Sequence, residues 1–319
     1  MKLIFIRRSR WIILPLLCMI TNSFLGQGES EAQLVGVRSA KILTMADEER
    51  QAYLFFCRLV NSRQKEEMGI EFLKRFPGSE VRNAVFLHTL HALMANCNYP
   101  FVLVWGERFF EYGLHDYAKV FVLESLMVAS QVLGEVEKAV CYAQQLLQVD
   151  PKNLGAFLTV PFLLAEYELT VNDYRIKTQA IDSARNGLTM VRPKNVSEEQ
   201  WQTYRTNLHA SLGLIHFQSG QYPQSQAAYL KAIELDQCDP VLYFRAGLAY
   251  SYDQKYEEAV DLLSRSVFLK GITKKPAEME LERVYRLKNK GASSGRSLIE
   301  SIHRLVQQAG LDLDQSETP

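Results

Sequence analysis

The sequence predicts an all-α fold, a right-handed solenoid of about seven helical hairpins stacked one after another. Two observations lead to this prediction. Residues 206–239 and 240–273 carry the same residue types at the same places when they are aligned at an offset of 34 positions. Outside this pair, apolar residues recur at the 3.6-residue spacing of helices, and no segment alternates β-branched and polar residues as a strand would.

The matched positions of the two regular repeats hold small residues where paired helices must approach closely. Gly213 aligns with Gly247, and Ser225 aligns with Ala259. Gly220 follows the first helix of the pair, where a residue of easy left-handed geometry favours the turn into the second helix. Each repeat is therefore predicted to be one helix–turn–helix hairpin.

The hairpin pattern continues less regularly on both sides of this pair. Residues 47–205 are predicted to be degenerate repeats, and residues 274–311 are predicted to be C-terminal capping helices whose charged outer faces end the stack. Residues 312–319 are expected to be a disordered tail. The individual helices and hairpins that we expect in these regions cover residues 47–61, 64–76, 81–95, 100–112, 120–153, 154–193, 276–290 and 296–309.

The residue pattern resembles the tetratricopeptide repeat, which also uses small residues at the helix contacts of a 34-residue unit. Three segments, Glu71–Ser79, Leu146–Asn153 and Ser211–Asp236, are similar to exported tetratricopeptide-repeat proteins of bacteria. The resemblance covers nearly all of the chain after its N-terminal segment. It implies a bacterial cell-envelope location and an interaction role, without an assigned reaction.

The first 28 residues have the composition of an export signal. Lys2, Arg7, Arg8 and Arg10 precede an apolar run at residues 11–20, and small residues at Gly26 and Gly28 favour cleavage after Gly28. We expect a signal peptide at residues 1–28, a linker at 29–46 and a periplasmic mature protein. The alternative is an uncleaved inner-membrane anchor at residues 11–25.

Four cysteines follow the predicted cleavage site: Cys57, Cys97, Cys141 and Cys238. An even number of cysteines in an oxidising compartment permits two disulfides. However, the cysteines are widely spaced, and most have apolar neighbours in the sequence. This favours single cysteines buried in the helical core.

Composition and motifs predict neither enzyme activity nor nucleic-acid binding. The chain carries 36 basic and 36 acidic residues, and no basic stripe interleaved with aromatics appears. No nucleophile elbow, phosphate loop or metalloprotease motif is present. His88 and His91 share a helix face, but no third ligand completes a metal site. Glu278–Glu282 is interpreted as solvated charge. We therefore predict no catalytic residue, no metal, no cofactor and no enzyme activity.

The predicted binding site is the groove lined by the first helix of each regular repeat. Its polar positions, with Asn207 and Arg245, are too few to clamp a peptide carboxylate, so the groove is apolar and aromatic. We expect it to accept an amphipathic helix or an extended apolar peptide. In the alternative, Phe244 and Leu248 pack against neighbouring helices or the C-terminal pair. The predicted groove residues are Asn207, Leu214, Phe217, Phe244, Arg245, Leu248 and Tyr252.

Together these patterns predict a non-enzymatic scaffold or assembly factor of the bacterial cell envelope, which binds a polypeptide partner and no nucleic acid. It would touch the membrane only if the N-terminal segment stays uncleaved. Two alternatives remain open at this point. One is an inner-membrane-anchored assembly component. The other is a non-catalytic subunit of an envelope enzyme complex.

Overall fold

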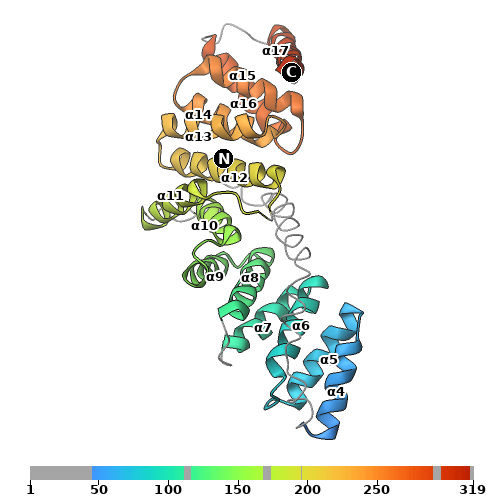
Figure 1. The fold of residues 1–319 in the computed structure, drawn as a ribbon. Helices are drawn as coiled ribbons and strands as arrows, with labels where there is room; N and C mark the ends of the chain where they lie inside the picture. Colours follow the sequence, from blue (N-terminus) through green and yellow to red (C-terminus); the bar gives the residue numbers. More distant parts are fainter. Residues whose placement is uncertain (1–44, 111–115, 168–173, 195, 290–295, 317–319) are drawn as a thin grey trace. The chain divides into compact units, whose positions relative to one another are not determined.

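The computed structural model describes residues 45–110, 116–167, 174–194, 196–289 and 296–316 (Figure 1). Within these ranges the chain forms fourteen α-helices and no strand, which confirms the all-α fold. The helices are α4 (Asp47–Arg58), α5 (Ser62–Arg75), α6 (Arg82–Ala95), α7 (Tyr99–Phe109), α8 (Asp116–Leu133), α9 (Val136–Val149), α10 (Leu154–Tyr167), α11 (Tyr174–Thr189), α12 (Glu198–Gln218), α13 (Tyr222–Leu235), α14 (Pro240–Tyr252), α15 (Tyr256–Leu269), α16 (Lys274–Lys288) and α17 (Arg296–Ser316).

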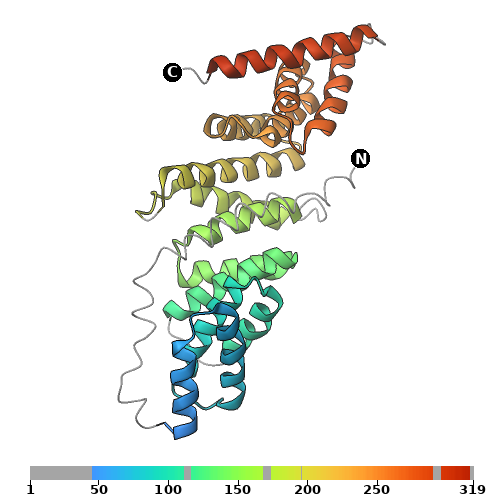
Figure 2. The ribbon, with the colours of Figure 1, turned by 90° about the vertical axis from the view of Figure 1, so that its right-hand side faces the viewer.

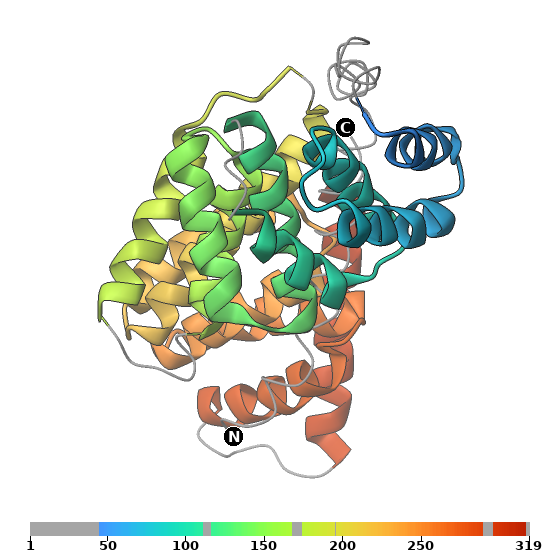
Figure 3. The same ribbon diagram turned by 90° about the horizontal axis from the view of Figure 1, so that it is seen from below.

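The described helices form two compact units, and the boundary between Thr159 and Val160 falls inside α10. In the first unit, helices that follow one another in the chain pack together (Figure 3). Helix α5 packs on α6, α7 packs on α8, and α8 packs on α9. A side chain at Gly69 would overlap Thr89 of α6, and a Cβ at Gly106 would lie 2.6 Å from Leu126 of α8. The two helices predicted at residues 81–95 and 100–112 are present as α6 and α7. The close contacts at the glycines, however, join α5 to α6 and α7 to α8.

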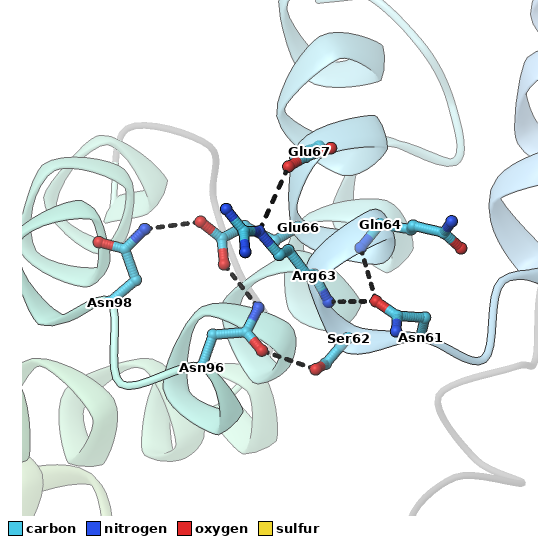
Figure 4. Close-up of polar contacts among 8 residues, drawn as sticks. All are labelled: Asn61, Ser62, Arg63, Gln64, Glu66, Glu67, Asn96 and Asn98. Carbon is cyan, nitrogen blue, oxygen red and sulfur yellow. Dashed lines mark hydrogen bonds and ion pairs between the residues drawn. The ribbon is translucent and has the colours of Figure 1, made fainter.

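A polar cluster ties the start of α5 to the turn between α6 and α7 (Figure 4). The side-chain amides of Asn96 and Asn98 donate to the two carboxylate oxygens of Glu66, at 2.7 and 2.6 Å. Ser62 Oγ donates to Asn96 Oδ1 at 2.6 Å, and Asn61 caps α5 by accepting from two backbone amides. One carboxylate of α5 therefore accepts from two side-chain amides of the turn and joins that turn to α5.

The second unit contains the two regular repeats, α12 with α13 and α14 with α15. A Cβ at Gly213 would lie 2.8 Å from the ring of Tyr229, and one at Gly247 would lie 2.7 Å from Leu263 Cγ. Ser225 Oγ donates to the backbone oxygen of Gly213 at 2.8 Å. These contacts confirm that the small residues of the 34-residue pattern lie where the paired helices approach each other.

Two predicted boundaries in the second unit are wrong. Helix α12 begins at Glu198 rather than near residue 206, because Ser197 and Gln200 form a capping box there and Trp201 and Tyr204 are buried. Helix α17 continues to Ser316, so residues 312–316 are helical rather than a disordered tail. Residues 317–319 lie outside the described ranges.

The predicted export signal at residues 1–28, the alternative anchor at 11–25 and the linker as far as residue 44 lie outside the described residues. Among the helices that the structure does describe, none is both long and apolar enough to cross a membrane.

The four cysteines are exposed and none of them is in a disulfide, which corrects the expectation that they are buried. The reason is visible at Cys141, whose neighbours Val140 and Tyr142 are both buried. Because adjacent residues of a helix point about 100° apart, a residue between two inward-facing neighbours lies outward on α9. Cys97 occupies a left-handed turn position, with φ of 56°.

A mostly buried carboxyl lies in the first unit, where α8 meets the start of α10. Glu124 Oε1 accepts from Asn153 Nδ2 at 2.6 Å, and Asn153 Oδ1 in turn accepts from the backbone amide of Ala156. Burial raises the pKa of Glu124 from about 4.5 to about 7, against the lowering effect of Asn153 and with a further rise from Asp150.

We expect Gly213→Leu to destabilise the protein by about 1–3 kcal/mol, because the new side chain overlaps the ring of Tyr229. The shift of the denaturation midpoint measures the effect. Gly78→Leu is the matched control, since nothing lies within 4 Å of the added Cβ at that turn position. Equal midpoints for the two variants would show that α12 and α13 do not meet at Gly213.

Glu124→Gln tests the buried carboxyl. A raised pKa means that the folded protein binds this proton more tightly than the unfolded chain. The stability that this carboxyl contributes is therefore present below pH 4.5 and is lost as the pH rises through about 7. Glu124→Gln should become more stable than wild type between pH 5 and 8, by up to about 3 kcal/mol. Chemical denaturation across this range measures it, with Glu137→Gln on the exposed face of α9 as the control. If the difference in stability between Glu124→Gln and wild type did not change with pH, the raised pKa of Glu124 would be contradicted.

Candidate functional site

Three aromatic rings from different helices meet in the second unit. They are Phe217 near the end of α12, Tyr222 at the start of α13 and Tyr252 at the end of α14. The ring centroids lie 5.8 Å apart for Phe217–Tyr222, 5.3 Å for Phe217–Tyr252 and 5.8 Å for Tyr222–Tyr252. These separations are those of favourable aromatic pairs. We call this group the aromatic triad.

The local sequence explains why the triad forms. Gly220, with φ of 70°, reverses the chain after α12, and the Gln221 amide donates to the His216 carbonyl at 2.9 Å. This tight turn returns Tyr222 onto Phe217. Because α14 packs against α13, Tyr252 of the second repeat completes the group. The triad therefore joins one repeat to the next.

Tyr252 is the exposed member of the triad. Its side chain is 54% exposed, whereas Phe217 and Tyr222 are half-buried beneath it. An aromatic residue that is this accessible and yet packed on two other rings loses little freedom when a partner covers it.

The end of α14 is held on one side by Gln226 of α13, which is buried. Its amide nitrogen donates to the carbonyl of Ala249 at 3.3 Å and to Asp253 Oδ2 at 2.9 Å, and its oxygen accepts from Lys255 Nζ at 3.0 Å. Hydrogen bonds from Lys255 and Gln226 lower the pKa of Asp253. The residue after Tyr252 is thus fixed in place.

On the other side, α14 is tied to α16 through the buried carboxylate of Glu280. Ser251 Oγ donates to Glu280 Oε1 at 3.0 Å, and Arg283 donates to both Glu280 oxygens and to Ser251 Oγ, at distances between 2.5 and 2.9 Å. The interpretation of Glu278–Glu282 as solvated charge is therefore wrong at Glu280, which is 8% exposed. Sequence reasoning missed it, although its i,i+3 spacing to Arg283 was a signal that it is paired.

The predicted groove residues separate into accessible and buried sets. Tyr252 is exposed, and the half-buried residues are Asn207, Phe217, Arg245 and Leu248. Arg245 also acts on Asp239, the N-cap of α14. Burial raises the pKa of Asp239, and the charge of Arg245 partly offsets this rise.

Phe244 and Leu214 are buried, at 4% and 9% exposure, and their assignment as groove-lining contacts is corrected. Phe244 packs in a core cluster with residues of α15 and α16, and Leu248 lies at the edge of the same cluster. The cause is the pairing of α16 with α14 and α15, which covers the side of α14 that the isolated repeat pattern leaves open. Phe244 therefore follows the alternative prediction, in which it packs against neighbouring helices instead of lining the groove.

Within the described ranges, no group of three or more His, Cys, Asp or Glu side chains is placed to hold a metal ion. His209 is half-buried on α12, and burial, together with the charges of Lys231 and Arg205, lowers its pKa to about 4. It is therefore neutral at neutral pH.

Antiparallel helix pairs that recur every 34 residues with glycine at the contact define a helical-hairpin repeat protein. The TPR repeat family model matches residues 213–254, which run from the first glycine contact to the end of α14. Residues 213–254 therefore match the tetratricopeptide repeat.

Several solved structures are similar to the chain, and no curated protein sequence matches it. A tetratricopeptide repeat protein from Parabacteroides merdae is 14% identical with a TM-score of 0.49, covering 82% of this chain and 100% of its own. The MamA protein is 15% identical with a TM-score of 0.41, covering 63% and 97%. A thermophilic TPR protein from Thermus thermophilus is 14% identical with a TM-score of 0.41, covering 70% and 98%.

Phe244→Ala should destabilise the protein by about 3–5 kcal/mol, because it opens a cavity among buried residues of α14, α15 and α16. Tyr252→Ala should cost only about 1 kcal/mol, the value of its aromatic contacts. Urea denaturation of both variants measures the contrast. If Phe244→Ala cost no more than Tyr252→Ala, Phe244 would not lie in the core.

Proposed function

We propose that this protein is a non-enzymatic scaffold or assembly factor that binds a polypeptide partner over the aromatic triad. Tetratricopeptide-repeat proteins in general bind proteins and are generally non-catalytic, which supports the class of function. The observation that carries the site is the exposure of Tyr252 on a helix end that is held from both sides.

The chemistry of this surface favours an apolar or aromatic partner side chain. Interface hot spots are enriched in tyrosine that is supported by its neighbours, because the partner then covers apolar area without ordering a mobile chain. Phe217, Leu248 and Tyr252 supply the apolar area, and Asn207 and Arg245 supply polar groups on the same two helices. Phe244 and Leu214 are buried and are not part of this surface.

An amphipathic helix or an extended apolar peptide would meet these requirements. Both present apolar side chains at regular intervals, every third or fourth residue in a helix and every second in an extended strand. The surface offers apolar groups on α12 and α14, which are one repeat apart, so a partner segment that contacts both must itself repeat its apolar residues.

The proposed location is the bacterial periplasm, supported by the basic and apolar composition of residues 1–28. The alternative is an inner-membrane-anchored assembly component that retains residues 11–25. Mass spectrometry of the protein isolated from cells separates the two: a mature N-terminus near Glu29 supports export with cleavage, and an intact N-terminus supports the anchor. A non-catalytic subunit of an envelope enzyme complex is a further alternative, and it would use the same surface.

The binding site is tested by affinity capture after crosslinking, with tagged wild type, Tyr252→Ala and Tyr174→Ala side by side. Tyr174 is 80% exposed on α11 and serves as the matched control, because the same substitution there removes an exposed tyrosine that is not part of the triad. We expect one set of partners with wild type and with Tyr174→Ala. With Tyr252→Ala their recovery should fall at least about tenfold, as for a hot spot worth about 2 kcal/mol. Equal recovery with all three would exclude the triad as the binding site.

A further inference from the structure

Helix α17 does not complete a hairpin with α16, its neighbour in sequence. It packs instead mainly on α15, so that the long red helix in Figure 2 lies across the last regular repeat. The regular repeats, in contrast, pair each first helix with the helix that follows it. The position of α17 is therefore determined by the surface on which it lies rather than by the preceding helix.

One face of α17 makes this contact. Ile302, Leu305 and Val306 are partly buried against the core cluster, and Ala309 is buried at 3% exposure. These positions follow the three- and four-residue spacing that places side chains on one side of a helix. The residues between them, including Arg304 and Gln307, are exposed. Helix α17 is thus amphipathic, and its apolar face meets the second unit.

The core beneath α17 is built from residues of α14, α15 and α16. Leu263 of α15 and Leu281 and Val284 of α16 are each 0% exposed, whereas Ile302, Leu305 and Val306 of α17 remain only partly buried. Because α15 packs on α14 and on α16 as well as on α17, those other contacts remain when α17 is released. Elements attached in this way open locally at a lower free energy than the whole unit.

The contact between α15 and α17 nevertheless depends on particular residues of α17. Gly310 lies directly on the ring of Phe268, where any added side chain would overlap the ring. Phe268 is 37% exposed and projects from α15. A small residue opposite an aromatic ring, next to an apolar stripe, is a recognition feature that an unrelated helix would lack.

We propose that α17 is a detachable lid, and that the surface it covers on α15 and α16 also accepts α17 from a second copy of the chain. The segment that fits this surface is α17 itself, and its docking relies on α15 rather than on a hairpin with α16. The same contacts can therefore form between two copies, which is a low-cost route to assembly. This inference does not depend on the aromatic triad.

The test uses the full chain and a fluorescent peptide of residues 296–316, with fluorescence anisotropy as the readout. In wild type the chain's own α17 competes, so the apparent affinity of the peptide is reduced by the fraction of chains that are open. Leu305→Asp places a charge on the apolar face and releases the lid. We expect this variant to bind the peptide at least about tenfold more tightly than wild type, corresponding to a lid that is closed in at least about 90% of wild-type chains.

Two matched controls accompany this measurement. The chain variant Gln307→Asp adds the same charge to the exposed face of α17 and should bind the peptide as wild type does. A peptide that carries Val306→Asp should not bind Leu305→Asp. Equal binding of the peptide to wild type, Leu305→Asp and Gln307→Asp would overturn the proposal.

Amide hydrogen exchange on the wild-type protein gives a second, independent test. This test does not depend on whether any variant folds. The amides of α17 should exchange together and at least about tenfold faster than those of α15, because the lid opens without the core. Exchange of α17 and α15 at one common rate would show that α17 is part of the cooperative unit, and the lid would be excluded.

Discussion

The structure depends on the close approach of paired helices at positions without a bulky side chain. At Gly213 the ring of Tyr229 occupies the space that a Cβ would need, and at Gly247 the side chain of Leu263 does the same. Packing at this distance buries apolar area and brings backbone groups within reach of short side chains, as in the hydrogen bond from Ser225 to the Gly213 carbonyl. The 34-residue spacing of these contacts then repeats the same geometry along the second unit.

The aromatic triad follows from that geometry. When two hairpins stack in the same way, the end of α12, the start of α13 and the end of α14 come together, and side chains far apart in sequence become neighbours. Two polar networks, around Gln226 and around Glu280, then fix the last turn of α14. In the Glu280–Arg283 pair the carboxylate is buried and the guanidinium is exposed, and desolvation of the carboxylate offsets part of the attraction between them. The value of this pair is positional, since it determines how α16 meets α14.

The C-terminal helices show how one fold can serve two purposes. Helix α16 continues the stack and buries Phe244, which removes that side chain from any contact surface. Helix α17 lies outside this core, on α15, with an apolar face that is only partly buried. An open-ended stack needs a cover on its last apolar surface. A cover that is attached by one amphipathic face is also one that can be exchanged.

The sequence by itself determined the helical class, the two regular repeats and the contact glycines, because helix periodicity and steric size act locally and recur at a fixed offset. Most helix positions followed from the same local rules, whereas the start of α12 depended on a capping box and two buried aromatics upstream of the repeat. Only the tertiary structure decided which side chains remain accessible. Phe244 and Tyr252 have similar chemistry and both lie on α14, yet α16 covers one and leaves the other exposed. Burial of a side chain depends on which helix packs over it, and the path of α16 and α17 is set by contacts that no local pattern records.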